Sequence, residues 1–378
     1  MYAQAYFDYD SKKSGGVTMS HLRFGKKPIK STYLIHKANF VACHNPSYVN
    51  KYNMVQELVD GGTFLLNCAW DMEGLEKHLP GQVKAFIANH DIKFYTIDGV
   101  KIGIETGMGP TRINTILQSA FFKLTGIIPE EQAIELMKAA AKATYGRKGD
   151  KIVQMNYDAI DAGAKQVVEI EVPESWKSCE DEGLFTPEVK GGKDDVVAFV
   201  KNIQSKVNAQ EGNTLPVSTF TDYADGSTPS GSAAYEKRGI AVDIPVWQSE
   251  NCIQCNRCAY VCPHAVIRPV ALTEDELAKA PEGTKAIDMI GMPGMKFTMT
   301  VSAYDCTGCG SCVNVCPGKK GEKALVMANM EENAAEQDIF DFGREIEVKP
   351  EVVAKFKPET VKGSQFKQPL LEFSGACA

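Results

Sequence analysis

The sequence predicts an α/β fold with a parallel sheet in its N-terminal half and a small, cysteine-rich α+β module in its C-terminal half. Three observations support this prediction. Short apolar stretches alternate with amphipathic ones between residues 31 and 149, as in parallel strands covered by helices. Eight of the twelve cysteines lie in two short runs of the same spacing. The chain has 378 residues, of which 44% are hydrophobic, enough for two or three domains with their own cores.

The first elements are predicted from local patterns. We expect a helix over residues 3–16, ended by a glycine pair, and then a strand over 31–44. An amphipathic helix over 48–62 would end at a second glycine pair. An open α/β sheet normally begins with a strand and a glycine-rich loop before its first helix. Because neither is present, we expect the chain to start inside a domain.

The alternation continues through the rest of this half. A glycine-rich turn precedes a helix from about Arg112 to Lys123, and Pro129 begins the last clear helix, with two glutamates at its positive end. Between these helices and the start, the expected elements are a strand over 63–67, a helix over 71–79, a helix over 82–92 and a strand over 93–98. Together they predict the parallel sheet and its covering helices.

The two cysteine runs share the pattern C-x2-C-x2-C-x3-C-P, which is the bacterial-ferredoxin spacing. In that pattern three thiolates wrap one [4Fe–4S] cube and the fourth ligates the other cube. We therefore expect a first set formed by Cys252, Cys255, Cys258 and Cys316. We expect a second set formed by Cys306, Cys309, Cys312 and Cys262. Gly308 and Gly310 give the second loop the backbone freedom to fold tightly.

Structural zinc is the alternative for these cysteines. Zinc usually takes its four ligands as two separated pairs, which leaves the third cysteine of each run and the C-P ending unexplained. The segment between the runs is longer than a minimal ferredoxin needs. Thr273 and Glu276 fit a capping box and predict a short helix, and residues 296–305 alternate like a strand. This segment either braces the cluster domain or decorates its surface.

Charge and hydropathy exclude several function classes. The net charge is −7, without long runs of one sign, so nucleic-acid binding has no compositional support. No stretch approaches 18 apolar residues, and the N-terminal residues lack the apolar region of a secretory leader. We expect a cytoplasmic protein, whose reduced thiols favour metal binding over disulfides.

Four stretches carry a resemblance to a known family: "YAQAYFDYDSKKSGGVTMSHLRFGKKPI", "GMGPTRINTILQSAFFKLTG", "YEKRGIAVDIPVWQSENCIQCNRCAYVCPHAVIRP" and "FSGACA". Together they resemble pyruvate:ferredoxin (flavodoxin) oxidoreductase in its large single-chain form, from residue 1 to 378. The implied fold class is an α/β gamma domain (parallel sheet with helices), then a small α+β EKR domain, then an α+β bacterial-ferredoxin-like 2[4Fe–4S] domain. The implied boundaries are 1–172 for an N-terminally truncated gamma domain, 173–243 for the EKR domain or linker, 244–330 for the ferredoxin-type domain, and 331–378 for a connector into a thiamine-diphosphate-binding domain.

The resemblance implies an enzyme of anaerobic metabolism that oxidatively decarboxylates pyruvate on thiamine diphosphate and Mg²⁺. Electrons would pass through three [4Fe–4S] clusters to ferredoxin or flavodoxin, and the acetyl group would go to coenzyme A. Cys377 matches one ligand of the third cluster, and the intact enzyme would be a homodimer. We assign no catalytic residue here and expect this chain alone to leave pyruvate unreacted. The alternatives are another 2-oxoacid:ferredoxin oxidoreductase and a standalone iron–sulfur electron-transfer subunit.

Other polar groups and cysteines are open to a functional or a purely structural interpretation. The donors of residues 20–27, namely Ser20, His21, Arg23, Lys26 and Lys27, suit phosphate or coenzyme A, or form a solvated loop. Lys319, Lys320 and Lys323 suit an acidic electron carrier or a plain charged surface. The triplet that names the EKR domain, Glu236, Lys237 and Arg238, is expected to be a solvated charged turn without a catalytic role. Cys43, Cys68 and Cys179 lack ligand spacing and are expected to be buried or idle thiols.

Overall fold

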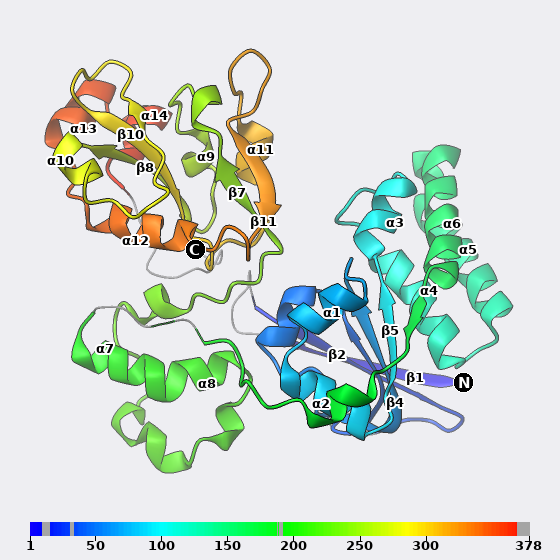
Figure 1. Ribbon diagram of the computed structural model, residues 1–378. Helices are drawn as coiled ribbons and strands as arrows, with labels where there is room; N and C mark the ends of the chain where they lie inside the picture. The colour runs from blue at the N-terminus through cyan, green and yellow to red at the C-terminus, as the bar shows by residue number, and fades with distance from the viewer. Residues whose placement is uncertain (10–15, 31–33, 187, 189–191, 369–378) are drawn as a thin grey trace. The chain divides into compact units, whose positions relative to one another are not determined.

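The computed structural model describes residues 1–9, 16–30, 34–186, 188 and 192–368. The described chain forms two compact units, one from residues 1–8 and 19–185 and the other from 9–18 and 186 onward (Figure 1). The predicted ligand Cys377 lies outside the described residues. The first unit corresponds to the predicted α/β half, and the second contains the EKR triplet and both cysteine runs.

The first unit is built on a four-stranded sheet in the order β3-β4-β5-β6. Its strands are β3 (Ala38–Cys43), β4 (Leu58–Asn67), β5 (Lys93–Ile97) and β6 (Val168–Ile170). The first three pair in parallel, with Phe64 opposite Phe94. The edge strand β6 pairs antiparallel to β5, and no sequence pattern predicted it. The predicted α/β class is confirmed, with a mixed rather than a wholly parallel sheet.

Alternate residues of β4 divide the core between the two faces of the sheet. Phe64 and Leu66 pack with Leu75 and Ile87 of α1 (Met72–His78) and α2 (Gly81–Asn89). Leu65 points to the other face. It packs there with residues of α3 (Gly99–Glu105), α4 (Asn114–Thr125) and α6 (Asp150–Lys165), while α5 (Glu130–Tyr145) packs outside them on α4 and α6. The period-2 alternation of a strand thus fixes a three-layer α/β/α arrangement.

The predicted N-terminal helix is wrong. Residues of that stretch form β1 (Tyr2–Tyr9), which pairs with β2 (Thr18–Gly25) in a two-stranded sheet. Tyrosine and phenylalanine fit a pleated surface better than a helix, and Arg23 Nη1 donates to Gln4 Oε1 at 2.9 Å across the pair. The argument that the chain opens in a helix therefore fails.

The predicted helix over 48–62 is also wrong. A short 3₁₀ helix covers only Pro46–Asn50, and β4 already begins at Leu58. The glycine pair lies inside this strand, where Gly61 has φ +70° and the register against β3 shifts between Ala38 and Phe40. The glycines therefore make a bulge in a strand and do not end a helix.

The remaining helix predictions of this half are confirmed by α1, α2, α4 and α5, which match the predicted ranges within a few residues. Two helices were not predicted. Helix α3 begins where Asp98 accepts a hydrogen bond from Lys101 N, and α6 is a strongly amphipathic helix that follows α5 after a short turn. Both follow directly on a predicted element.

The second unit starts with the helical EKR segment. The amphipathic pattern of residues 194–209 predicts a helix there. The structure has it as α7 (Asp194–Phe199), a π-helical turn (Val200–Gln204) and α8 (Ser205–Asn208) without interruption. Its buried side Val196, Phe199, Val200 and Ile203 packs with Leu215, Tyr223 and Tyr235. The EKR segment therefore has a small core of its own.

Two antiparallel sheets frame the cysteine runs. One pairs β7 (Asp243–Trp247) with β11 (Leu325–Asn329), and the other has the order β8-β10-β9. The second sheet consists of β8 (Ile267–Leu272), β9 (Ile287–Asp288) and β10 (Lys296–Val301). The predicted capping box of Thr273 and Glu276 is confirmed at α10 (Glu274–Leu277), and β10 confirms the predicted strand.

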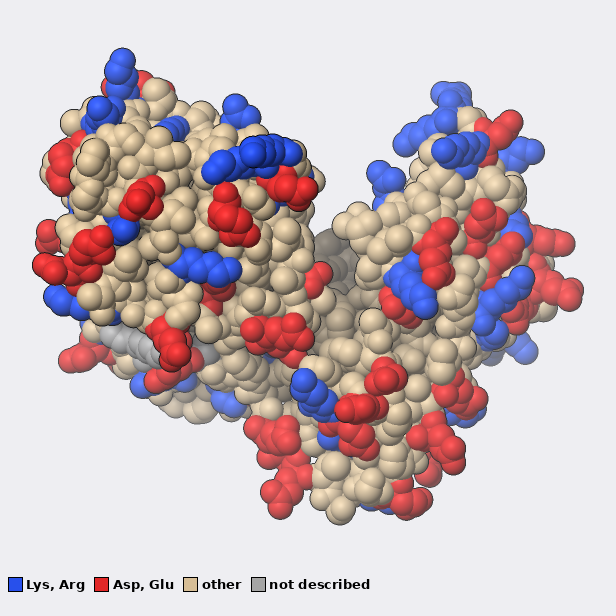
Figure 2. Space-filling model, turned by 45° about the horizontal axis from the view of Figure 1, so that its top comes forward, with Lys and Arg blue, Asp and Glu red and all other residues tan. Residues whose placement is uncertain are grey.

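Three further helices follow the second run: α12 (Glu336–Glu345), α13 (Pro350–Phe356) and α14 (Val361–Gln365). Helix α12 packs on β10 and β8, and α14 packs on α9 (Arg257–Tyr260) of the first run. In the described ranges no helix has the length and apolar character needed to cross a membrane. Acidic and basic side chains are interspersed over the face shown in Figure 2.

Candidate metal centre

The two cysteine runs have the same backbone conformation. In the first run the residues on either side of the second cysteine, Gln254 and Asn256, have φ of 57° and 58°. The equivalent positions of the second run, Gly308 and Gly310, have φ of 69° and 71°. Each run then enters a short helix, α9 in the first and α11 (Ser311–Val315) in the second. The second loop uses the backbone freedom expected of its glycines, and both loops adopt the left-handed conformation at these positions.

Hydrogen bonds offset the cost of the left-handed residues in the first loop, which lacks glycine. The Gln254 amide donates to Asp288 O and accepts from Ile290 N, both at 2.8 Å. Asn256 Nδ2 donates to Lys362 O of α14 at 2.9 Å. Since non-glycine residues rarely adopt this conformation, these contacts hold the loop in shape. The segment between the runs therefore braces the first loop and is not only a surface decoration.

The thiols of each predicted set interact with one another across the two runs. Cys252 interacts electrostatically with Cys255 and with Cys316 of the other run. Cys262 reaches in the opposite direction, towards Cys306 and Cys312. Cys258 interacts electrostatically with Cys252 and Cys255 of its own set and with Cys312 of the other, so the two sets adjoin. This proximity supports the exchange of the fourth ligand, and the ligand sets themselves remain predictions.

Burial strongly favours the protonated form of these thiols when no metal is bound. Desolvation raises the pKa of Cys306 to about 12 and that of Cys312 to about 11, with smaller contributions from neighbouring thiols. Desolvation likewise raises the pKa of Cys258 and, more weakly, that of Cys252. Metal binding removes the thiol proton. The positive charge of the iron–sulfur core then stabilises the buried thiolates, which water does not reach.

Donors on the chain are aimed at the sulfurs. Gln254 N donates to Cys252 Sγ at 3.3 Å and Gly308 N to Cys306 Sγ at 3.4 Å, two equivalent bonds in the two loops. Ala324 N donates to Cys316 Sγ at 3.3 Å. The buried Trp247 Nε1 makes no hydrogen bond of normal geometry, yet it favours the thiolate of Cys252. Such donors stabilise thiolate ligands and tune cluster potentials, so the residues present fit a [4Fe–4S] cube.

No three described His, Cys, Asp or Glu side chains are arranged to bind a single metal ion together. In a [4Fe–4S] cube each thiolate binds a different iron, so the thiols of one set do not need to meet at one atom.

The EKR triplet is not a solvated turn, and that prediction is wrong. Lys237 forms an ion pair with Asp305, and their side chains are only 12% and 17% exposed. Lys237 Nζ also donates to Ser302 Oγ at 3.1 Å and lies 5.6 Å from the Phe340 ring centre. Because Asp305 directly precedes Cys306, the triplet anchors the EKR segment at the start of the second run. The sequence around Lys237 does not indicate this ion pair, since Asp305 lies far along the chain.

The neighbouring members of the triplet are also engaged. Arg238 Nη2 donates to Asn208 Oδ1 at 3.2 Å, and its Nε lies 3.8 Å from a carboxylate oxygen of Glu236. Both side chains are largely buried, so the triplet ties α8 to the chain that leads into β7.

The possible phosphate-binding residues are spread over β2 and the chain after it. His21 is buried, and its Nδ1 accepts a hydrogen bond from Ile35 N at 3.1 Å. Arg23 is bonded to Gln4, whereas Lys26 and Lys27 are exposed. Lys323 donates to the carbonyls of Val313 and Asn314, which close α11, while Lys319 and Lys320 are exposed. Cys43 and Cys68 are buried, as expected of idle thiols, and Cys179 is half-buried.

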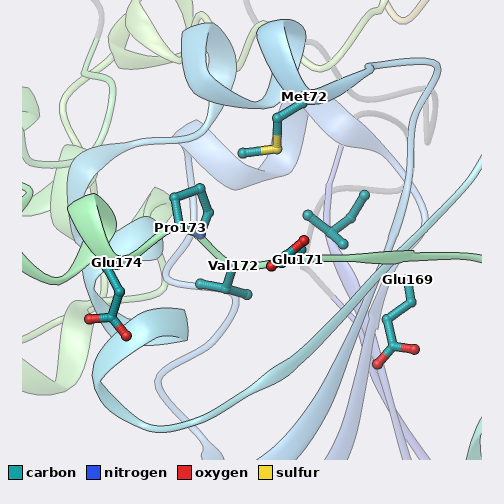
Figure 3. Close-up of a pocket in the computed structure, with 7 residues that line it drawn as sticks. Met72, Glu169, Glu171, Val172, Pro173 and Glu174 are labelled. Atoms are coloured by element: carbon teal, nitrogen blue, oxygen red, sulfur yellow. The ribbon is translucent and has the colours of Figure 1, made fainter.

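A hollow of about 590 Å³ lies on the first unit, lined by Met72 and by residues 169–174 of β6 and the following chain (Figure 3). Glu169 and Glu174 lie on opposite sides of it, and Glu171 adds a third carboxylate. This acidic lining does not suit an anionic substrate such as a 2-oxoacid, and the hollow contains none of the predicted site residues.

Family comparisons agree with the domain order that the resemblance implies. Residues 1–166 match the family model described as pyruvate ferredoxin/flavodoxin oxidoreductase, residues 187–241 match the EKR domain of unknown function, and residues 251–320 match a 4Fe-4S dicluster domain. The chain is 52% identical over its whole length to pyruvate:ferredoxin oxidoreductase of Moorella thermoacetica. Over residues 1–166 the chain matches the pyruvate ferredoxin/flavodoxin oxidoreductase family, and over its whole length it is similar to a segment of proteins of that name.

Other relatives in this family carry different acceptors in their names. The chain is 51% identical over its whole length to pyruvate-flavodoxin oxidoreductase of Enterobacter agglomerans. It is 44% identical over 99% of its length to pyruvate dehydrogenase [NADP(+)] of Cryptosporidium parvum. The chain spans 31% of the Moorella and Enterobacter proteins and 20% of the Cryptosporidium protein. The dicluster match supports iron–sulfur clusters in the second unit.

Proposed function

We propose that this chain carries electrons in the oxidation of pyruvate, through two [4Fe–4S] clusters bound by the first and second thiol sets. The observation that carries the proposal is the repeated loop, in which two runs of thiols have matching left-handed residues and matching N–H···S bonds. A [4Fe–4S] cluster accepts and releases one electron at a time. Two adjoining sets, linked by the neighbouring Cys258 and Cys312, suit a relay between clusters.

The chain's residues give each set of thiols an apolar lining on one side. Cys258 and Cys312 belong to an apolar cluster with Trp247, Ile267 and Phe297. Cys306 belongs to a second apolar cluster that includes Ile244 and Met330. Exclusion of water strengthens the effect of each nearby hydrogen bond and charge on a cluster. Cys309 of the second set is exposed, whereas Cys306 and Cys312 of the same set are buried.

The reaction of the whole protein is part of the same proposal. We propose that it decarboxylates pyruvate with thiamine diphosphate and Mg²⁺, uses a third [4Fe–4S] cluster, and transfers the acetyl group to coenzyme A. Ferredoxin or flavodoxin would accept the electrons, and the protein would act in the cytoplasm as a homodimer. The names of the relatives support the substrate and the acceptors. Lys26 and Lys27 are the exposed cations of the β2 segment and the best placed of its donors for a coenzyme A phosphate.

Anaerobic reconstitution with iron and sulfide is expected to yield about eight iron and about eight sulfide per chain, because each run nucleates one four-iron cube. Metal analysis, acid-labile sulfide and the EPR spectrum of the dithionite-reduced protein measure this directly. Alanine at the unrelated Cys179 is the control and should leave both values unchanged. A product with stoichiometric zinc and no sulfide would contradict the cluster assignment.

A further inference from the structure

Arg268 is a buried cation of the cluster module without an acidic partner. It lies on β8, and its side chain is only 6% exposed. Among the described residues, no Asp or Glu forms an ion pair with it. Removing a guanidinium from water is costly unless a negative charge or enough hydrogen bonds compensate it. The side chain therefore requires compensation from another group.

The hydrogen bonds of Arg268 direct it to the turn that follows Cys262. Its Nε donates to Ala265 O at 3.1 Å, and Ala265 N donates to Cys262 O at 3.4 Å. Ala265 itself has φ of 54°, which the closed turn imposes. Nη1 donates to Gln365 Oε1 of α14 at 3.0 Å. The guanidinium thus folds back over the chain that carries one ligand of the second set, with only neutral oxygens as hydrogen-bond partners.

The charge of Arg268 persists in this position. Burial lowers the pKa of its guanidinium to about 10, while the Cys262 sulfur opposes this shift. The side chain is therefore positive at neutral pH, and Cys262 is the ionisable group that favours its charge. Four thiolates leave a bound cube with a net negative charge, which grows by one on reduction.

We infer that Arg268 is the built-in counter-charge of the cluster held by Cys262, Cys306, Cys309 and Cys312, and that it raises the reduction potential of that cluster. The inference rests on the proposed function. A fixed buried cation stabilises the more negative, reduced cluster more than the oxidised one. Arg268 acts through the Cys262 turn and the electrostatic field, as a positioning and tuning residue.

The first set has a different arrangement. Lys362 is the cation that interacts with Cys252 and Cys255, and it is half-buried, with its Nζ 4.0 Å from the Phe356 ring centre. Water screens a half-buried charge more than a buried one. The two clusters should therefore differ in potential although their loops are alike.

The test compares Arg268→Gln with Arg268→Lys in the anaerobically reconstituted chain, with Arg344→Gln on the exposed side of α12 as the matched control. Redox titration followed by EPR gives the two midpoint potentials. We expect Arg268→Gln to lower the equilibrium constant for reduction of the second-set cluster at least tenfold. For one electron this is a fall of 59 mV in its midpoint potential. In Arg268→Gln the potential of the first-set cluster should stay close to that of the unmodified protein. In Arg268→Lys and in Arg344→Gln both potentials should stay close to the unmodified values.

Two loaded clusters with unchanged potentials in Arg268→Gln would overturn the inference, as would a shift confined to the first-set cluster. If Arg268→Gln loses the second-set cluster, the Arg268→Lys variant shows whether the site needs the charge or the shape of the guanidinium. Retention of that cluster by lysine supports the need for a charge, and its loss with lysine shows that only the guanidinium shape matters. An unmodified chain that binds no cluster would refute the proposed function instead.

Discussion

Alanine at Cys262 is expected to remove the cluster of the second set and to leave the cluster of the first set in place. The Cys262 sulfur interacts with Cys306 and Cys312, which belong to the other run. Its loss leaves the cube of that run with three thiolates in a buried site. We expect the iron content to fall by about four per chain, and the EPR signal of one cluster to disappear.

The reciprocal variant sharpens this result. Cys316→Ala should remove the first-set cluster, because Cys316 interacts with Cys252 and accepts a hydrogen bond from Ala324 N. Comparison of the two variants, with Cys179→Ala as the control, assigns each EPR signal to one set. If Cys262→Ala instead perturbs only the cluster of Cys252, Cys255 and Cys258, the exchange of ligands between runs is wrong.

Methionine at Lys237 is expected to destabilise the second unit by about 3 kcal/mol. The substitution leaves Asp305 buried without its cation, and removal of one partner of a buried ion pair usually costs several kcal/mol. Ser302 Oγ still donates to Asp305 at 2.7 Å, which keeps the loss below the upper end of that range. Denaturant unfolding of the reconstituted chain, followed by cluster absorbance, measures the change.

A double-mutant cycle isolates the pair itself. Asp305→Asn in the Lys237→Met background should recover much of the lost stability, because neither charge then remains unpaired. Lys201→Met, an exposed lysine of the same helical segment, is the control and should change the stability by no more than about 0.5 kcal/mol. A Lys237→Met protein as stable as this control would show that the ion pair does not anchor the EKR segment.

Local patterns predicted those elements whose energy is local. The capping box of Thr273 and Glu276 is satisfied within one helical turn, and both of its hydrogen bonds are present. The same holds for helix α1, which starts at the Asp71 cap and ends before Pro80. The cysteine spacing predicts the two ligand sets, because it reflects how far a short loop can reach round a cube, and the sets stay a prediction.

Patterns that depend on a distant partner were misread. Tyr6 and Phe7 could belong to a helix face or a strand, and the pairing of β1 with β2 decides between them. Gly61 looked like the end of a helix, whereas its positive φ serves a bulge against β3. Lys237 looked solvated because its partner Asp305 is 68 residues away. In each case the deciding contact lies outside any window along the sequence.

The first cysteine loop shows the same limit in the site. Glycines at 308 and 310 announce a left-handed loop, but Gln254 and Asn256 do not. Only the contacts to Asp288, Ile290 and Lys362 explain how these residues keep the shape. The cysteine spacing shows that the two loops are equivalent. It does not show which contacts hold the first loop in the same shape as the second.

The pairing of β7 with β11 has a consequence for the order of events in biosynthesis. Strand β7 precedes the first cysteine run and β11 follows the second, with Trp247 opposite Leu325. The thiols can converge only after a long loop has closed, a slow step whose entropic cost precedes its reward. A chain still on the ribosome cannot finish this pairing until β11 has emerged. Until then its cysteines are free thiols that are exposed to the solvent. Delivery of iron and sulfide should therefore follow synthesis of the module, and oxidants should harm the growing chain more than the finished one.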